Sequence, residues 1–302
     1  LFQIVDGIFV GHFVGADGLA GITLAWPILC LLMSTGIMIG MGGGSLISNY
    51  RGEGKTVKAQ QSLSTSLLLW LLLGLPTTLL AYLCSPLLLT VQGAEAEVLQ
   101  LGIEYIDLLA LGALLPIGST ALPLLIRNLD SPNVATFVLV MGALLNIALD
   151  YLLVAHWQMG LKGAAIATLL AQLFICLTSL GYLLSSRCPA QLSLRSLSFQ
   201  TSDAIELMQL GSSAMVMTLY TSFVVALHNW LFMQYASPVA VAAFGLVGYL
   251  MMLFYQLAGG IAEGIQPPVS YYFGSEKFGR IKQLILLALK VILISGLIWV
   301  VL

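Results

Sequence analysis

The chain has 302 residues, of which 59% are hydrophobic and only 8% are charged, and its mean hydropathy is +1.01. A soluble globular protein carries about 25% charged residues, so this composition excludes a soluble enzyme, a nucleic-acid-binding protein and a disordered chain. The formal net charge of −2 points to no strongly charged partner.

Apolar runs of about 20 residues recur along the whole sequence, which is typical of a polytopic helical membrane protein. Polar breaks divide these runs into nine predicted helices. In chain order they cover residues 1–14, 18–48, 60–83, 97–126, 133–155, 162–185, 204–235, 239–271 and 283–302. The expected fold class is therefore an all-α membrane protein.

The first run is too short to span a bilayer, because the break at residues 15–17 follows fewer than about 17 apolar residues. The sequence also begins with Leu1 rather than Met, so we expect residues to precede it. The run is not a signal peptide, since it has no basic start and Asp6 interrupts it.

Lysine and arginine are distributed unevenly between the predicted loops. Nine of the eleven lie in alternate loops, namely Arg51, Lys55, Lys58, Arg127, Arg187, Arg195, Lys277, Arg280 and Lys282. The opposite loops contain Lys162, and Lys290 lies inside the last run. Basic loops of membrane proteins stay in the cytoplasm, which predicts that the start of the chain is cytoplasmic too.

The sequence matches itself without gaps at a shift of 222 residues. Residues 48–55 (SNYRGEGK) align with residues 270–277 (SYYFGSEK), so that serine, tyrosine, glycine and lysine coincide. Gly42 likewise aligns with Gly264. The repeating unit contains six helices, an even number, so both copies enter the membrane from the same side. Such parallel copies are related by an axis along the membrane normal.

The repeat divides the chain into two lobes. The first lobe covers residues 1–186, and a polar, serine-rich linker covers residues 187–203. The second copy begins at residue 204 and reaches residue 302 after three helices. We therefore expect a fragment of a protein with two six-helix bundles related by a pseudo-two-fold axis, the second bundle being incomplete here.

Polar residues at membrane depth are the main functional candidates, because a charge at the bilayer centre costs at least about 2.5–3.5 kcal/mol. Asp6 lies on the order of 12–15 Å from the external end of the first helix. Asn146 and Asp150 share one face of the fifth helix by their i, i+4 spacing, and Thr168 lies at a similar depth in the sixth. These oxygens suit a proton shared between carboxylates, or a small hard cation such as Na⁺. A purely structural hydrogen-bond network is the alternative.

Two further titratable residues are placed in predicted helices of the second copy. Glu263 lies just before Gln266-Pro267-Pro268, where it would bind a cationic substrate, form part of a gate, or line water near the proline break. His228 aligns with Asp6 in the repeat, so it either carries protons or is a buried neutral histidine.

Motifs for catalysis and for bound cofactors are absent from the sequence. Gly54-Lys55-Thr56 resembles the end of a phosphate loop, but Asn49 occupies the position of the required glycine. The four cysteines form no CxxC pair, and no HExxH segment occurs. We expect no enzymatic activity, no cofactor and no resident metal.

Several stretches, taken in their order, resemble the multidrug and toxic compound extrusion (MATE) transporters, in particular their DinF-like and MepA-like branch. These stretches are residues 5–12, 127–132, 146–150, 160, 163–168 and 266–267, and the resemblance covers essentially the whole chain. It implies twelve helices in two six-helix lobes with both termini cytoplasmic. It also implies that the ion-coupling positions of the first lobe are Asp6, Asn146, Asp150 and Thr168.

The resemblance further implies a secondary antiporter. Such a protein, expected to be a monomer in the bacterial inner membrane, exports amphipathic or cationic organic compounds in exchange for H⁺ or Na⁺. Trp26 and Tyr255 are candidates for aromatic substrate contacts, with Glu263, His228 and Gln266 as further substrate or gating candidates. The rival transport function is a flippase for lipid-linked saccharides, which would require a more basic central cavity. A structural or receptor protein would not explain polar groups at one shared depth.

Overall fold

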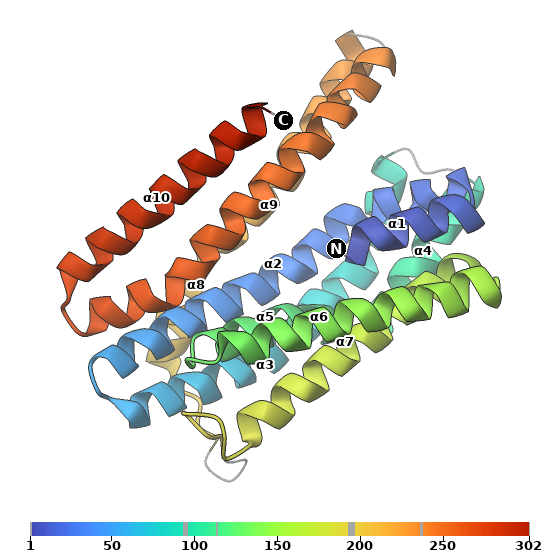
Figure 1. Ribbon diagram of the computed structural model, residues 1–302. Coiled ribbons are helices and arrows are strands. Elements are labelled where there is room, and N and C mark those ends of the chain that lie inside the picture. The colour runs from blue at the N-terminus through green and yellow to red at the C-terminus, as the bar shows by residue number, and fades with distance from the viewer. Residues whose placement is uncertain (1, 93–95, 113, 193–196, 236–237, 302) are drawn as a thin grey trace.

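The structure is a computed structural model, and it describes residues 2–92, 96–112, 114–192, 197–235 and 238–301. Within these ranges all the regular elements are helices (Figure 1). In chain order they are α1 (Phe2–Phe13), α2 (Ala16–Gly52), α3 (Thr56–Val91), α4 (Ala96–Leu111), α5 (Leu115–Arg127), α6 (Pro132–Asp150), the π-helical segment η1 (Tyr151–His156), α7 (Gly160–Leu184), α8 (Thr201–Tyr235), α9 (Pro238–Gly274) and α10 (Phe278–Val301).

Each predicted helix coincides with an observed one, but two of them differ in form. The helix expected over residues 97–126 is bent by 52° between α4 and α5. Pro116 lies in the first turn of α5, where a missing N–H donor is tolerated. The helix expected over residues 133–155 changes to π-helical geometry directly after Asp150.

The described helices are those of a multi-pass membrane protein. Five of them are long and apolar enough to cross a membrane, and the bent pair α4–α5 makes a sixth candidate within the described residues. These five are α2, α3, α6 continued by η1, α7 and α10.

Helix α3 shows how the residues are sorted between the interior and the lipid. Its buried side includes Ser62, Ser66 and Thr78, whereas its outer side carries leucines such as Leu75 and Leu83, which are 59% and 65% exposed. A surface this apolar would favour association in water, but it suits hydrocarbon chains.

Helix α2 lies at the centre of the N-terminal bundle, which we define as α1–α7. Its small residues allow α5 to approach at backbone distance. A Cβ atom on Gly36 would lie 2.5 Å from the carbonyl oxygen of Ile117, and one on Gly44 would lie 2.3 Å from the Asn128 amide nitrogen. Close contact at small residues is a usual means of packing membrane helices.

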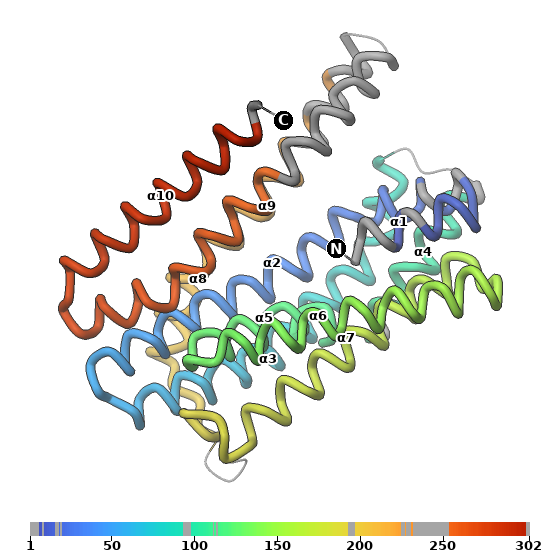
Figure 2. Tube along the Cα trace, in the orientation of Figure 1, coloured from blue at the N-terminus to red at the C-terminus, as the bar shows by residue number. Residues whose placement is uncertain are grey.

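The C-terminal helices α8–α10 meet this bundle mainly through α2. On α8 the carbonyl oxygen of Leu207 lies only 2.1 Å from where a Cβ on Gly42 would be. Helix α9 crosses α2 near the α2–α3 and α9–α10 turns and runs away from it beyond (Figure 1, Figure 2). We call the end of the molecule that holds these two turns the basic end, because it carries Arg51, Lys55, Lys58, Lys277, Arg280 and Lys282.

The two turns at the basic end have the same backbone conformation. Lys55 N donates to Tyr50 O at 2.8 Å, and Lys277 N donates to Tyr272 O at 2.9 Å. Gly54 has a φ of 76°, and the residue 222 positions later, Glu276, has a φ of 57°. The two segments that the predicted repeat aligns therefore share their backbone hydrogen bonds.

The segment between α7 and α8 packs against α3 together with the first turn of α8. Gln200 N donates to Thr65 Oγ1 at 3.1 Å, and Ser62 Oγ donates to the buried Asp203 carboxylate at 2.5 Å. Cys188 is also buried. Some of the polar residues that predicted a linker here therefore form hydrogen bonds to α3.

Candidate ion-coupling site

The four polar residues expected at one depth come together inside the N-terminal bundle. Asp6 on α1 is 2% exposed, Asn146 and Asp150 on α6 are fully buried, and Thr168 on α7 is 9% exposed. The Asp6 carboxylate lies beside the other three side chains. Their assembly from three helices was predicted, while their role in ion coupling stays a prediction.

Local sequence explains how the three helices bring these groups together. The i, i+4 spacing of Asn146 and Asp150 places both on the inner face of α6. Small residues at the start of α7 let it approach η1, since a Cβ on Gly163 would lie 3.0 Å from the carbonyl oxygen of Leu153. Thr168 follows on the same helix and reaches Asp6.

Within the described residues, most polar atoms of the cluster form no hydrogen bond of normal geometry although their side chains lie beside one another. Thr168 Oγ1 donates to Asp6 Oδ2 at 3.1 Å. The atoms without such a bond are Asp6 Oδ1, both carboxylate oxygens of Asp150, and the amide oxygen and nitrogen of Asn146. Buried polar atoms in proteins are normally paired, so this set departs from the norm.

The chemistry of the set fits a small positively charged ligand. Two neighbouring carboxylates repel each other unless a proton or a cation lies between them. Carboxylate, amide and hydroxyl oxygens are the ligands that hard cations prefer. The residues present therefore fit either a shared proton or a bound Na⁺.

Tyr105 was not predicted as part of this region. It lies on α4, is 3% exposed, and is within electrostatic reach of both Asp6 and Asp150. A tyrosine near the end of a membrane helix is usually attributed to the aromatic belt at the interface. Nothing in its sequence spacing distinguishes it from such a belt residue.

Glu263 and Gln266 lie elsewhere, between α9 and the end of α5. Arg127 Nη1 lies 3.2 Å from Glu263 Oε2. The amides of Asn128 and Gln266 form a reciprocal pair, because each nitrogen donates to the other's oxygen at 3.1 Å. Gln266 Nε2 also donates to Ser45 Oγ on α2 at 2.8 Å. These two candidates therefore join α9 to the N-terminal bundle.

Tyr255 and Trp26 do not join either group. Tyr255 is 62% exposed on α9, and Trp26 is partly buried against the apolar core of the N-terminal bundle. His228 belongs to α8, but its side chain lies outside the described residues.

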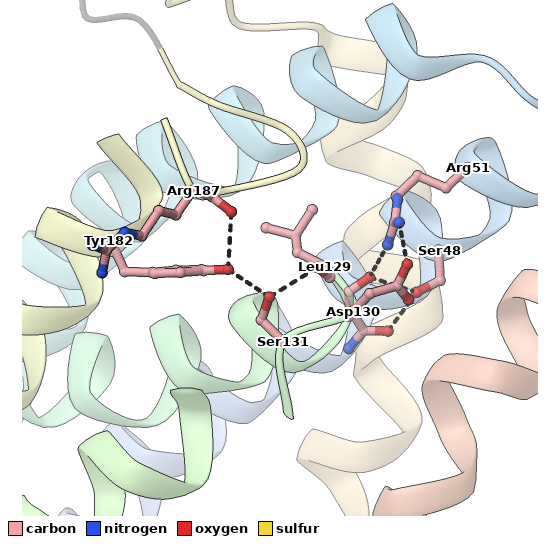
Figure 3. A network of polar contacts seen from close by, with 8 residues as sticks. Ser48, Arg51, Leu129, Asp130, Ser131, Tyr182 and Arg187 are labelled. Carbon is pink, nitrogen blue, oxygen red and sulfur yellow. Dashed lines mark hydrogen bonds and ion pairs between the residues drawn. The ribbon is translucent and has the colours of Figure 1, made fainter. Parts of the chain in front are cut away.

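The loop between α5 and α6 is a polar junction that the sequence did not single out as one. Arg51 on α2 donates to the carbonyl oxygen of Asn128 at 3.2 Å and forms an ion pair with Asp130 (Figure 3). Ser131 lies 2.5 Å from the Tyr182 hydroxyl on α7. The loop therefore ties together α2, α5, α6 and α7 at the basic end.

Known proteins similar to this chain are membrane exporters. A family profile named MatE matches residues 1–152. The multidrug export protein MepA of Staphylococcus saprophyticus is 26% identical over 298 residues, which are 97% of this chain and 66% of that protein. The protein of the same name from Staphylococcus aureus strain MRSA252 is 26% identical over 285 residues, or 94% of this chain and 63% of that protein. The chain thus spans less than two thirds of the length of these relatives.

Solved structures agree with the sequence comparison. A crystal structure described as MATE in the bent conformation superposes with a TM-score of 0.87 at 25% identity, over 96% of this chain and 65% of that one. The straight conformation gives a TM-score of 0.88 at 24% identity, over 98% and 66%. With a family profile matching half of the sequence, a shared fold and relatives along the whole chain, this chain belongs to the MatE family of multidrug and toxic compound extrusion transporters.

Proposed function

We propose that this chain is the larger part of a secondary antiporter that exports amphipathic or cationic organic compounds in exchange for H⁺ or Na⁺. The proposal assigns it transport rather than catalysis, and action as a monomer. The similar proteins named multidrug export proteins support the class of substrate.

The observation that carries the proposal is the buried cluster of Asp6, Asn146 and Asp150. These side chains are buried together, and within the described residues most of their carboxylate and amide oxygens form no hydrogen bond of normal geometry, which is costly for a buried polar group. A structural network would satisfy these atoms. A coupling site instead leaves them free for a proton or a cation that arrives and departs.

The proposed orientation follows from the basic residues. Loops rich in lysine and arginine stay on the cytoplasmic side, so we place the basic end in the cytoplasm of a bacterial inner membrane. The Asp6 cluster then lies nearer the external side, where a proton or Na⁺ that flows inward would bind first.

Exchange requires that the ion changes the affinity for the exported compound. A proton or cation at Asp6 and Asp150 would favour one packing of α1, α6 and α7 over another, and a ligand shifts such an equilibrium by its differential affinity. Compounds would bind between the N-terminal bundle and the C-terminal helices. Glu263, Gln266, His228, Tyr255 and Trp26 are the proposed substrate and gating residues.

The test measures efflux of a fluorescent organic cation from vesicles that contain the complete protein. An imposed proton gradient and an imposed sodium gradient are applied separately, which identifies the coupling ion. We expect one gradient to drive flux and Asp150→Asn to reduce that flux about 5- to 150-fold, the range of typical coupling energies. Glu104→Gln is the matched control, because Glu104 is an acidic residue paired with Lys162 at 3.4 Å outside the cluster.

Flux that neither gradient drives, with any organic cation tried, would contradict the antiporter and favour the lipid-linked saccharide flippase. Flux that persists in Asp150→Asn would leave the transporter but reduce the cluster to a structural role. The second outcome requires that Asp150→Asn elutes as a folded protein at wild-type yield.

A further inference from the structure

The bend between α4 and α5 is held by residues of α3. Trp70 Nε1 donates to the main-chain oxygen of Leu114 at 2.9 Å, and this oxygen also accepts from Gly118 N at 2.8 Å. Four residues further along α3, Gly74 leaves room for the Leu114 side chain, because a Cβ there would lie 2.5 Å from it. Trp70 and Gly74 share one face of α3 by this spacing. Leu114, which directly precedes α5, is therefore fixed to α3 through both its main chain and its side chain.

Helix α7 supports the same bend. A Cβ on Gly118 would lie 2.5 Å from the Trp70 ring and 3.0 Å from Cys176 Sγ. The Cys176 thiol in turn donates to the main-chain oxygen of Leu115 at 3.7 Å. A break in a membrane helix needs partners of this kind, because lipid offers none to the backbone groups that the break sets free. Among the described residues, Trp70 supplies the indole donor at this break.

The bend also determines where α4 lies beside the candidate ion-coupling site. The end of α4 touches α7, since a Cβ on Gly112 would lie 2.2 Å from the side chain of Leu169. Leu169 follows Thr168, the residue that donates to Asp6. Tyr105, seven residues before Gly112, shares its face of α4 and lies within electrostatic reach of Asp6. A change of the bend would therefore move Tyr105 relative to the carboxylates.

On a different side, α4 is not fully packed. A small cavity lies between α2, α3 and α4, and its apolar lining includes Ile28, Leu32, Ala81, Ile106 and Leu109. Apolar cavities usually stay dry, so the side chains that line them lack contacts on one side. Packing therefore constrains α4 less here than a close-packed interior would. The hydrogen bond at the bend contributes correspondingly more to the position of α4.

We infer that Trp70 is a positioning residue of the ion-coupling site, because its indole N–H holds the bend that brings Tyr105 on α4 against the Asp6 cluster. The inference rests on the proposed function, which assigns ion coupling to that cluster. Without the N–H, the bend relaxes, α4 shifts toward the cavity and the carboxylates lose part of their surroundings. The affinity for the coupling ion then falls, although Trp70 itself does not touch the ion.

The test removes the indole N–H in the complete protein and measures the affinity for the coupling ion. Trp70→Phe keeps an aromatic ring and removes the donor. In the vesicle efflux assay, we expect the concentration of the driving ion at half-maximal flux to rise about 2- to 10-fold, the effect of one lost hydrogen bond. Flux at saturating ion should stay at the parent level, because only ion binding is affected. Trp157→Phe, which changes a tryptophan that is 60% exposed, is the control and should alter neither quantity.

A second variant displaces the Trp70 ring without removing it. Gly118→Ala introduces a Cβ at 2.5 Å from that ring, so it should raise the half-maximal ion concentration as Trp70→Phe does. Two changes that break one interaction are not additive, so the double variant should resemble the single ones. Gly181→Ala on α7 is the control, since a Cβ there would meet nothing within 4 Å. Gly118→Ala keeps the test decisive if Trp70→Phe does not fold.

The indole hydrogen bond can also be followed without transport. The difference between the ultraviolet resonance Raman spectra of the parent protein and Trp70→Phe isolates the band of this indole, whose frequency depends on hydrogen bonding at Nε1. Coupling between two sites is reciprocal, so binding of the coupling ion should shift this band. The shift should be absent in Asp150→Asn, which lacks one carboxylate of the ion site.

A lowered unfolding midpoint of Trp70→Phe with an unchanged half-maximal ion concentration would overturn the inference, because Trp70 would then have a structural role only. A Raman band that does not respond to the ion would overturn it as well. Failure of the proposed function is a different observation, namely that neither gradient drives flux in the parent protein.

Discussion

Two buried polar clusters lie at the two ends of α6, and they differ in how completely their atoms are paired. At the basic end, just before α6 begins, the Asn128 amide pairs with Ser48, Leu124 and Gln266. At the other end, the neighbour of the Asp150 carboxylate is a second carboxylate, that of Asp6, and neither Asp150 oxygen forms a hydrogen bond of normal geometry. The 19 residues of α6 separate the two clusters by about 28 Å.

The completeness of hydrogen bonding distinguishes polar groups that stabilise the fold from polar groups that bind a ligand. Fully paired buried networks rigidify a protein, whereas unpaired ones are costly and are retained where they act. Burial alone does not make this distinction, since Asn128 and Asp150 are both buried. Substitutions in the two clusters should therefore have opposite consequences for stability and for transport.

The largest effect expected is on transport, in Asp150→Asn. Removing the charge should reduce coupled flux about 5- to 150-fold. The midpoint of thermal unfolding in detergent should not fall, because a neutral amide is less costly to bury than an unpaired carboxylate. Differential scanning fluorimetry beside the flux assay checks both parts. A strongly lowered midpoint would mean that Asp150 has a structural partner after all.

Asn128→Ala should have the opposite profile, with the larger effect on stability. It removes one of the two acceptors of Ser48 Oγ and leaves the Gln266 side-chain oxygen without its donor, and an orphaned buried group costs about 1–3 kcal/mol. Asn133→Ala, an exposed asparagine in the first turn of α6, is the control and should stay within about 0.5 kcal/mol. Equal unfolding midpoints for the two variants would mean that the hydrogen bonds of the Asn128 side chain do not stabilise the protein.

A third change tests whether the segment after α7 is fixed to α3. Ser62→Ala removes a 2.5 Å hydrogen bond to the buried Asp203, and a bond to a charged group contributes about 1.5–3 kcal/mol.

Burial raises the pKa of the Cys188 thiol, and because the thiolate is the reactive form, maleimide labelling at neutral pH is slow.

Loosening the segment should expose Cys188 and accelerate that labelling in a protein with no other cysteine. Ser213→Ala, on the exposed side of α8, should leave the rate as it was. A rate that is fast before the substitution would mean that the segment is not packed against α3.

The smallest effect expected is that of Glu263→Gln. Its partner Arg127 is 3.2 Å away, but the Glu263 side chain is 50% exposed, and such ion pairs contribute about 0.2–1 kcal/mol. The unfolding midpoint should shift less than in Asn128→Ala, and added salt should reduce the difference from the parent protein. A shift as large as that of Asn128→Ala would mean that the ion pair stabilises the protein as much as the Asn128 hydrogen bonds do.

Much of the fold could be predicted, because a segment that crosses the lipid bilayer must be a long apolar helix. Apolar runs located the helices, and the 222-residue repeat located twin turns that the structure shows to be alike. The bend before α5 and the π-helical segment after Asp150 escaped prediction, since both depend on how neighbouring helices pack. The helices α2 and α3 are also longer than predicted, because polar residues such as Arg51 and Lys58 continue a helix and because Pro86 does not end α3.

The candidate ion site could be assembled from depth and spacing, since charged residues are rare enough in a membrane helix to be noticed. Asn128 gave no such signal, because an asparagine at a helix end is ordinary. Its importance comes from Ser48 and Gln266, which are 80 and 138 positions away. Contacts between residues so far apart in the chain produce no periodic pattern in a single sequence.

The twin turns have a practical consequence for stabilising the protein. Gly54 and Glu276 adopt the same left-handed conformation, which an L-residue other than glycine adopts at a cost of about 1–2 kcal/mol. Glu276→Gly, which introduces the residue that the first copy has at this position, is therefore a rational choice for a more heat-resistant variant. In a protein that contains one segment twice, the two copies can be aligned with each other. The residue found at a position in one copy then indicates which residue the same backbone conformation tolerates in the other copy.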